Sequence, residues 1–425
     1  MIAAQQSSLA TVATLAVSLA VRMTRQCCLL ALIATLALPT FATAQADTAR
    51  RPTRDTVTVQ GSMYSRPFVG TVSKLSLGGY VEGNTNYFVE DGLSEGFSME
   101  LRRFNLFVYS PIASRLRFFS ELEFEHGTEE ISLETAQLDI QMMPALAARM
   151  GIMVLPVGAF NQNHDSPRWE FIDRPLVSTR IIPSTLSDVG FGVYGRVQPR
   201  DATTLTYDAY LSNGLGDGII TNDEGRTSLP LGKRAEQFEE DNNGSPAMSG
   251  RLAVQQRGIG EFGLSWYGAN YNAFKAEGVT VDESRRVTIA ALDFSTSIGR
   301  LSIRGEAALA RVQLPPSLNE VFAHQQQGAH VDLVLPVVKR RMLGSPNATI
   351  NLALRLEYID LNVGRFSSTG ELIHDDVAAV VGGLSFRPSA STVLKANYRR
   401  QNSRDLLGNA PSKLGGYQVG FATYF

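Results

Sequence analysis

Apolar and polar residues alternate at period two along most of the chain after residue 73. Successive side chains of a β-strand point to opposite faces, so this alternation predicts strands with one apolar face. We predict sixteen strands, at 74–90, 97–110, 114–126, 131–143, 147–157, 188–198, 202–212, 247–256, 260–274, 285–298, 301–314, 329–342, 349–361, 376–387, 391–403 and 414–425.

The connections between these segments alternate in length. Short turns rich in Pro, Gly, Ser and Ala, such as "SPIAS", "QPRDAT" and "RPSAS", alternate with connections most of which are longer, notably 158–187, 213–246, 314–328, 362–375 and 404–413. Short periplasmic turns and long external loops are typical of outer-membrane proteins, whereas a soluble sandwich has no reason to alternate so regularly. We therefore expect an all-β chain, a transmembrane antiparallel β-barrel of about sixteen strands.

Charged residues share one face of several predicted strands. In 114–126 the opposite, apolar face holds Leu116, Phe118, Leu122 and Phe124. An arginine that faces lipid at mid-depth costs about 2–4 kcal/mol, so we expect the charged faces to line a wet lumen. The predicted lumen-lining residues are Arg115, Arg117, Arg149, Arg196, Arg304, Arg355, Lys395, Arg399, Glu121, Glu123 and Glu125, with Asp139, Glu306 and Glu357 on equivalent faces. Within 97–110 the phase slips around Phe107, a pattern that a β-bulge would produce.

The last predicted strand has one apolar face. Its members are Tyr417, Val419, Phe421 and Phe425. Because the strands of a barrel close into a ring, this strand is expected to pair with the first one, near 74–90. Its terminal aromatic residue and alternating apolar side chains resemble the signal that the barrel-assembly machinery recognises in many outer-membrane proteins.

The N-terminal residues have the pattern of a secretory signal. From Met23, "MTRQCCLLALIATLALPTFATAQA" has an early arginine, an apolar core over 27–38 and small residues that suit cleavage after Ala44 or Ala46. We interpret 1–46 as the signal segment, with translation starting at Met23; an unusually long signal or an uncleaved anchor is the alternative. Residues 47–73 would be a polar periplasmic lead-in, and 74–425 the barrel.

Composition narrows the choice of function. Of the 425 residues, 44% are apolar and 19% are charged, which argues against disorder, and a net charge of −2 argues against nucleic acid as a partner. No window after residue 50 has the run of about 18 apolar residues that a membrane-spanning helix needs. Both cysteines, Cys27 and Cys28, lie in the signal segment, so a disulfide in the mature chain is not expected.

One stretch resembles a known family. The run "RMGIMVLPVG", followed by "RWEFIDRPLV" and "IPSTLSDVGFGVYGRV" over 149–197, is similar to the phosphate-selective porin O and P family. That resemblance implies an outer-membrane porin that passes small hydrophilic solutes, with loop 158–187 folded into the lumen. It also implies anion or phosphate selectivity, and porins of this size often form homotrimers. The expected partners are outer-membrane lipids, the assembly machinery and the solutes, and no cofactor is expected.

Loop 158–187 differs from the family in its charges. The family selects anions with lumen arginines and constriction lysines, but this loop has no lysine. Its basic residues are Arg168, Arg174 and Arg180, and its acidic residues are Asp165, Glu170 and Asp173. The arginines would favour anions at the narrowest point of the pore. Alternatively, they pair with the loop's own carboxylates and attach the loop to the wall.

A barrel of this kind need not be a channel. A barrel plugged by the lead-in or by loop 213–246 could act as a scaffold or adhesin instead of a channel. Catalysis is not expected, because the five histidines (His126, His164, His324, His330 and His374) have no catalytic or metal-ligand spacing. The acidic strings 217–225 and 239–246 lack the spacing of a calcium-binding loop and are interpreted as external loop.

Overall fold

The computed structural model describes residues 58–68, 70–72, 75–233, 238–241 and 243–425. The predicted signal segment 1–46 and the beginning of the predicted lead-in lie outside the described residues. None of the described helices is long and apolar enough to cross a membrane.

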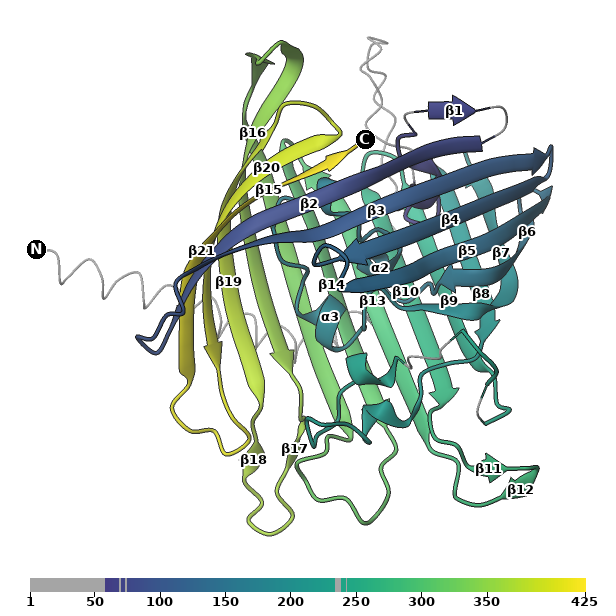
Figure 1. Cartoon of the computed structure of the whole chain (residues 1–425), viewed down its shortest axis with the longest axis vertical. Helices are drawn as coiled ribbons and strands as arrows, with labels where there is room; N and C mark the ends of the chain where they lie inside the picture. The colour runs from purple at the N-terminus through teal and green to yellow at the C-terminus, as the bar shows by residue number, and fades with distance from the viewer. Residues whose placement is uncertain (1–57, 69, 73–74, 234–237, 242) are drawn as a thin grey trace, which may run out of the picture. The chain divides into compact units, whose positions relative to one another are not determined.

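Sixteen long strands form one closed antiparallel sheet (Figure 1). Each strand pairs with its neighbours along the chain, and β21 pairs with β2 to close the ring, for example Tyr87 opposite Tyr417. The predicted barrel, its strand number and its closure by the last strand are confirmed. The strands are β2 (Leu75–Glu90), β3 (Phe97–Ala113), β4 (Leu116–Glu125), β5 (Glu130–Met143), β6 (Leu146–Val154), β7 (Ser187–Arg200), β8 (Thr203–Ser212), β9 (Ala247–Gln256), β10 (Gly260–Asn270), β13 (Arg286–Ile298), β14 (Leu301–Val312), β15 (Gln325–Met342), β16 (Ser345–Asp360), β19 (Asp376–Arg387), β20 (Thr392–Ser403) and β21 (Ser412–Tyr424).

The two ends of the barrel differ in their connections. At one end the strands are joined by turns of two to four residues, such as 114–115 and 388–391. The other end has the long segments 155–186 and 213–246, and the small hairpins β11 (Lys275–Ala276) with β12 (Val279–Thr280) and β17 (Gly364–Arg365) with β18 (Leu372–Ile373). Short turns are periplasmic in such barrels and long loops are external. Two external loops, 91–96 and 126–129, are nevertheless short.

The wall is apolar outside and polar inside. On β9, Leu252 is 63% exposed, whereas its neighbour Arg251 is 2% exposed and points inward. The same contrast separates Leu292 from Asp293 on β13. A soluble protein would bury the leucines and expose the charges, so this reversed pattern is that of a barrel in lipid. The chain is an outer-membrane β-barrel.

The interior of the ring is largely filled. Loop 155–186 contains α2 (Ala159–Gln162), η2 (Ser166–Arg168) and α3 (Val177–Arg180), and Figure 1 shows both α-helices within the ring. Apolar loop residues such as Val177, Ile181 and Ile182 are buried against inward-facing residues of the wall. A second buried cluster joins Met63 of η1 (Ser62–Ser65) to aromatic residues of β2, β3 and β4: Tyr80, Phe107 and Phe119.

The outward face of β9 provides a test of this arrangement. We expect Leu252→Arg, in the middle of the strand, to lower the free energy of unfolding by about 2–4 kcal/mol, because the charge would face hydrocarbon. Met248→Arg, on the same face near the external end, should cost only about 0–1 kcal/mol. Both values can be measured by denaturant titration of the barrel in lipid vesicles. Equal costs at the two positions would contradict the assigned depth of the wall.

Candidate functional site within the barrel lumen

Loop 155–186 is attached to the inner wall by side chains of the wall itself. Glu306 on β14 accepts hydrogen bonds from the backbone N–H of Phe160, at 3.0 Å, and from the Ser178 hydroxyl, at 2.7 Å. Two strands further along the ring, Glu357 on β16 accepts one from the Leu176 N–H at 3.0 Å. Buried backbone donors need such acceptors, so polar wall residues hold the loop in one position.

Part of the predicted lead-in also lies inside the ring. The backbone N–H of Val59 donates to Glu261 on β10 at 3.0 Å, and the Gln60 amide donates to Asp208 on β8, also at 3.0 Å. The Tyr64 hydroxyl donates to Asp139 on β5. Residues 58–68 therefore reach inner-wall residues of three separate strands.

Arg66 joins this segment to both the loop and the wall. Its guanidinium donates to Asp165 of the loop at 2.8 and 2.5 Å and to Glu121 of β4 at 2.7 Å, and it lies 4.2 Å from the centre of the Phe107 ring. Burial would raise the pKa of Asp165, but Arg66 and Arg168 outweigh that effect and hold this pKa well below its usual range. The contacts form a fully buried, charged junction.

Two β-bulges place extra charged residues in the lumen. On β3, the pairing passes from Arg103 opposite Glu82 to Leu101 opposite Gly83, which leaves Arg102 without an opposite residue. On β5, Glu134 likewise has no opposite residue, because the pairing passes from Thr135 opposite Glu121 to Leu133 opposite Leu122. An extra residue in one strand lets two neighbours face the same side. Arg102 and Arg103 consequently both reach carboxylates of the interior.

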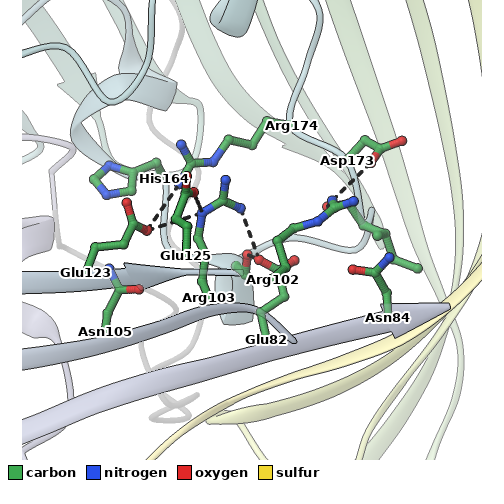
Figure 2. Close-up of polar contacts among 12 residues, drawn as sticks. Glu82, Asn84, Arg102, Arg103, Asn105, Glu123, Glu125, His164, Asp173 and Arg174 are labelled. Atoms are coloured by element: carbon green, nitrogen blue, oxygen red, sulfur yellow. Dashed lines mark hydrogen bonds and ion pairs between the residues drawn. The ribbon is translucent and has the colours of Figure 1, made fainter. Parts of the chain in front are cut away.

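The charges near the bulges form a network (Figure 2). Arg103 contacts three carboxylates, at 3.2 Å from Glu82, 3.2 Å from Glu123 and 2.6 Å from Glu125. Arg102 lies 3.0 Å from Asp173 of loop 155–186. The network thus links the wall at β2–β4 to the loop, and it contains both positively and negatively charged side chains.

His164 lies at the edge of this network. Its Nδ1 is 2.8 Å from the carbonyl oxygen of Asn161, and its Nε2 is 3.1 Å from a carboxylate oxygen of Glu134. Burial disfavours the imidazolium, but the Glu134 carboxylate outweighs it and raises the pKa of His164. The Glu134 carboxylate thus favours the protonated form of this histidine.

Glu121, Glu134 and His164 also bring three potential metal ligands within 4.8 Å of one another. The sequence spacing did not indicate this grouping. Both oxygens of Glu121 are already used, one by Arg66 at 2.7 Å and the other by the Asn105 amide at 2.8 Å. A guanidinium therefore supplies the positive charge that a cation would bring, and the donor set does not fit a metal.

Most predicted lumen-lining residues point inward and are paired. Arg149 contacts Asp139 at 2.8 Å, Arg355 contacts Asp332 at 2.6 Å, and Arg399 contacts Glu357 at 3.2 Å. The ammonium of Lys395 donates to two carbonyl oxygens of the loop, at 2.9 and 3.0 Å. The others are Arg117, which donates to Gln141 and Tyr194, Arg304, which lies 5.4 Å from the Trp169 ring, and Glu121, Glu123 and Glu125.

Two predicted lumen residues, Arg115 and Arg196, lie at the periplasmic end of the barrel. Arg115 is exposed in the turn between β3 and β4, because β4 begins at Leu116 and the alternating pattern continues into the turn. Arg196 lies near the periplasmic end of β7 and is exposed there. Arg115 is therefore a turn residue. Arg196 pairs with the buried Thr206 of β8 and is on the inward face of β7, as predicted, at its periplasmic end.

The three loop arginines have different surroundings. Arg168 donates to the Tyr424 hydroxyl at 2.8 Å and to the Ser62 carbonyl at 2.8 Å, so it fastens the loop. Arg174 is mostly buried, 4.0 Å from Glu123. Arg180 is exposed and has no ion pair with any described residue. The acidic residues of the loop pair with other elements: Asp165 with Arg66, Glu170 with Arg387, and Asp173 with Arg102.

Several lumen residues were not predicted. Arg251 could have been found, since Leu252 and Val254 alternate with it on β9. Arg102 and Glu134 could not, because a bulge breaks the alternation on which the prediction depends. The position of Arg66 carries no sequence signal, because the lead-in has no periodicity.

Sequence comparisons do not assign the chain to a family. No protein-family model matches the chain. An uncharacterised protein of Aquifex aeolicus is 32% identical over 185 residues, which are 42% of this chain and 40% of that relative, so the match spans less than half of its length. The resemblance to phosphate-selective porins O and P stays a prediction.

Solved structures of outer-membrane proteins share the barrel. An anion-selective porin from Comamonas acidovorans superimposes with a TM-score of 0.54 at 13% identity, over 83% of this chain and 99% of the porin. OprB of Pseudomonas putida gives 0.52 at 10% identity, over 83% and 94%. OmpT of Vibrio cholerae in a trimer form gives 0.51 at 12% identity, over 83% and 100%. The chain has the fold of outer-membrane porins.

His164 should make the loop sensitive to pH. Its pKa is raised in the folded protein, so its stabilising effect is fully present below the unfolded value of about 6.5 and is lost as the pH rises through the folded pKa. We expect the amide hydrogens of residues 159–168 to exchange more readily, after correction for intrinsic rates, as the pH is raised to 9. His164→Gln should remove this dependence; an identical pH profile in both proteins would contradict it.

Proposed function

We propose that the protein is a passive diffusion channel for small hydrophilic solutes in the outer membrane. One observation supports this most: charged side chains between the loop and the wall at β2–β4 are partly exposed, although many residues of the surrounding loop are buried. Glu125 is 21% exposed, Glu100 23% and Asp173 31%. Water-accessible charges of this kind in an otherwise filled lumen are what a narrow polar pathway requires.

We further propose a modest preference for anions. Most lumen charges are neutralised by a partner and act on solutes only weakly. Arg180 is exposed and has no ion pair among the described residues, so it contributes a positive charge that a solute can meet. Loop 158–187 contains no lysine and so gives no support to phosphate as the solute.

A plugged barrel with a scaffold or adhesin role is the second candidate. The observation that favours it is the position of residues 58–68, which contact β4, β5, β8 and β10 from inside.

Assembly into a homotrimer is a separate proposal, supported by the trimer form of OmpT.

Single-channel recording separates the two candidates. We expect discrete conductance steps from the mature protein in planar bilayers, and larger steps from a variant that lacks residues 47–68, because the deletion widens the lumen. Heat-modifiable migration in gels is the control for folding. A silent full-length barrel whose truncated form conducts would establish the plugged state, and a truncated barrel that is folded and silent would refute the channel.

Arg180 is expected to set part of the ion preference. A unit charge at about 10 Å in water contributes about 0.4 kcal/mol, which changes the local anion concentration about twofold. We therefore expect Arg180→Gln to lower the anion-to-cation permeability ratio about twofold, measured as the reversal potential in a salt gradient. Arg365→Gln, on the external β17–β18 hairpin, is the matched control and should leave the ratio unchanged. The same ratio in the wild type and Arg180→Gln would exclude this role.

A further inference from the structure

The outer surface of the barrel has a groove where β2, β20 and β21 meet near their external ends. This open groove has a volume of about 440 Å³ and is lined by Tyr87, Tyr398, Arg400, Lys413, Gly415 and Tyr417, among others. The groove lies on the opposite side of the wall from the channel, so it has no part in the proposed passage of solutes.

Gly415 opens the groove. It lies on β21, the middle one of the three strands, and pairs with Arg400 of β20 on one side and with Val89 of β2 on the other. A Cβ atom at this position would lie 3.1 Å from the Tyr398 hydroxyl. Without a side chain at residue 415, the surface between the neighbouring side chains is left as a depression.

The aromatic residues show the depth of the groove in the membrane. Tyr398 and Tyr417 lie with ring centres 4.9 Å apart, and Tyr87 lies 4.8 Å from Phe97. Aromatic belts mark the level of the lipid head groups, with the apolar band below them. The outward residues on the periplasmic side of these rings are apolar: Leu394, Val419 and Phe421. The groove therefore opens at the outer head-group level.

Two basic residues stand at this level. Arg400 follows Tyr398 by two positions, and Lys413 precedes Tyr417 by four. Both basic residues are on the outward face, toward the external end. Both are exposed, and neither has an ion pair with a described residue. Asp91 is the one acidic residue of the lining, and one of its oxygens accepts the backbone N–H of Lys413 at 2.9 Å.

We propose that this groove binds the phosphorylated head group of an anionic glycolipid in the outer leaflet. Arg400 and Lys413 would contact the phosphate, and the tyrosine rings would pack against the sugar and the upper part of the acyl chains. Two cations above an apolar belt complement a lipid that carries its negative charge directly above its acyl chains. A soluble anion would need no such belt.

The test uses the full-length barrel in detergent with three probes: diphosphorylated lipid A, the same lipid without phosphates, and inorganic phosphate. Binding is measured as the rise in the midpoint of thermal unfolding and as lipid retained per barrel in native mass spectrometry. We expect lipid A to bind to the wild type, and to bind about thirtyfold more weakly to the Arg400→Gln, Lys413→Gln double variant. The other two probes should have little effect.

Two further variants sharpen the result. Gly415→Val fills the groove and keeps both cations, and it should also weaken lipid A binding. Arg311→Gln removes an exposed cation at the external end of β14, away from the groove, and should bind as the wild type does. Undiminished binding by the double variant or by Gly415→Val would overturn the proposal. So would an equal loss in Arg311→Gln, equal binding of the dephosphorylated lipid, or equal protection by inorganic phosphate.

Discussion

Hydrocarbon can solvate neither a charge nor an unpaired peptide group, and this exclusion determines the form of the molecule. Unpaired strand edges would be unstable in lipid, so β21 closes on β2 over eleven paired positions, from Tyr80 opposite Tyr424 to Glu90 opposite Leu414. The same exclusion directs the charged side chains of the wall inward at membrane depth. The interior therefore receives both arginines and carboxylates, and many of them lie close enough to pair.

Pairing then decides which charges remain available to a solute. In a filled interior, removing one member of a buried ion pair costs about 3–5 kcal/mol, because its partner is left without compensation. Arg251, with Asp293 at 2.5 Å and Glu261 at 3.1 Å, is a structural cation in this sense. Arg66 has the same role between the wall and the loop. Under the proposed channel function, ion preference would depend on residues such as Arg180, which forms no ion pair with a described residue.

Features that follow the alternation of apolar and polar residues could be predicted from the sequence. Features at a bulge, in a turn or in the lead-in, where the alternation is interrupted, misleading or absent, could not. Alternation gave the strands, their faces and the inward direction of Arg149, Arg355 and Arg399. The alternation also continues through the tight turn between β3 and β4, and for that reason Arg115 was assigned to the lumen. Phe107 looked like a phase slip, yet it lies in register and packs inside the barrel, and the actual bulge lies at Arg102. The interior position of residues 58–68 depends on complementary contacts with distant strands, which local patterns do not encode.

The bulges also bear on how the length of a strand can vary between relatives. Residues 97, 99 and 101 face outward, and residues 103, 105 and 107 face inward, so Arg102 is the one position between two regular stretches of β3. Deleting that codon would join two correctly phased halves and leave every other side chain on its own face, and the same holds for Glu134 on β5. A one-residue deletion normally inverts a strand, but here it would keep the faces and remove one interior charge together with its ion pairs. Homologous barrels could therefore differ in lumen charge by single insertions and deletions as well as by substitutions.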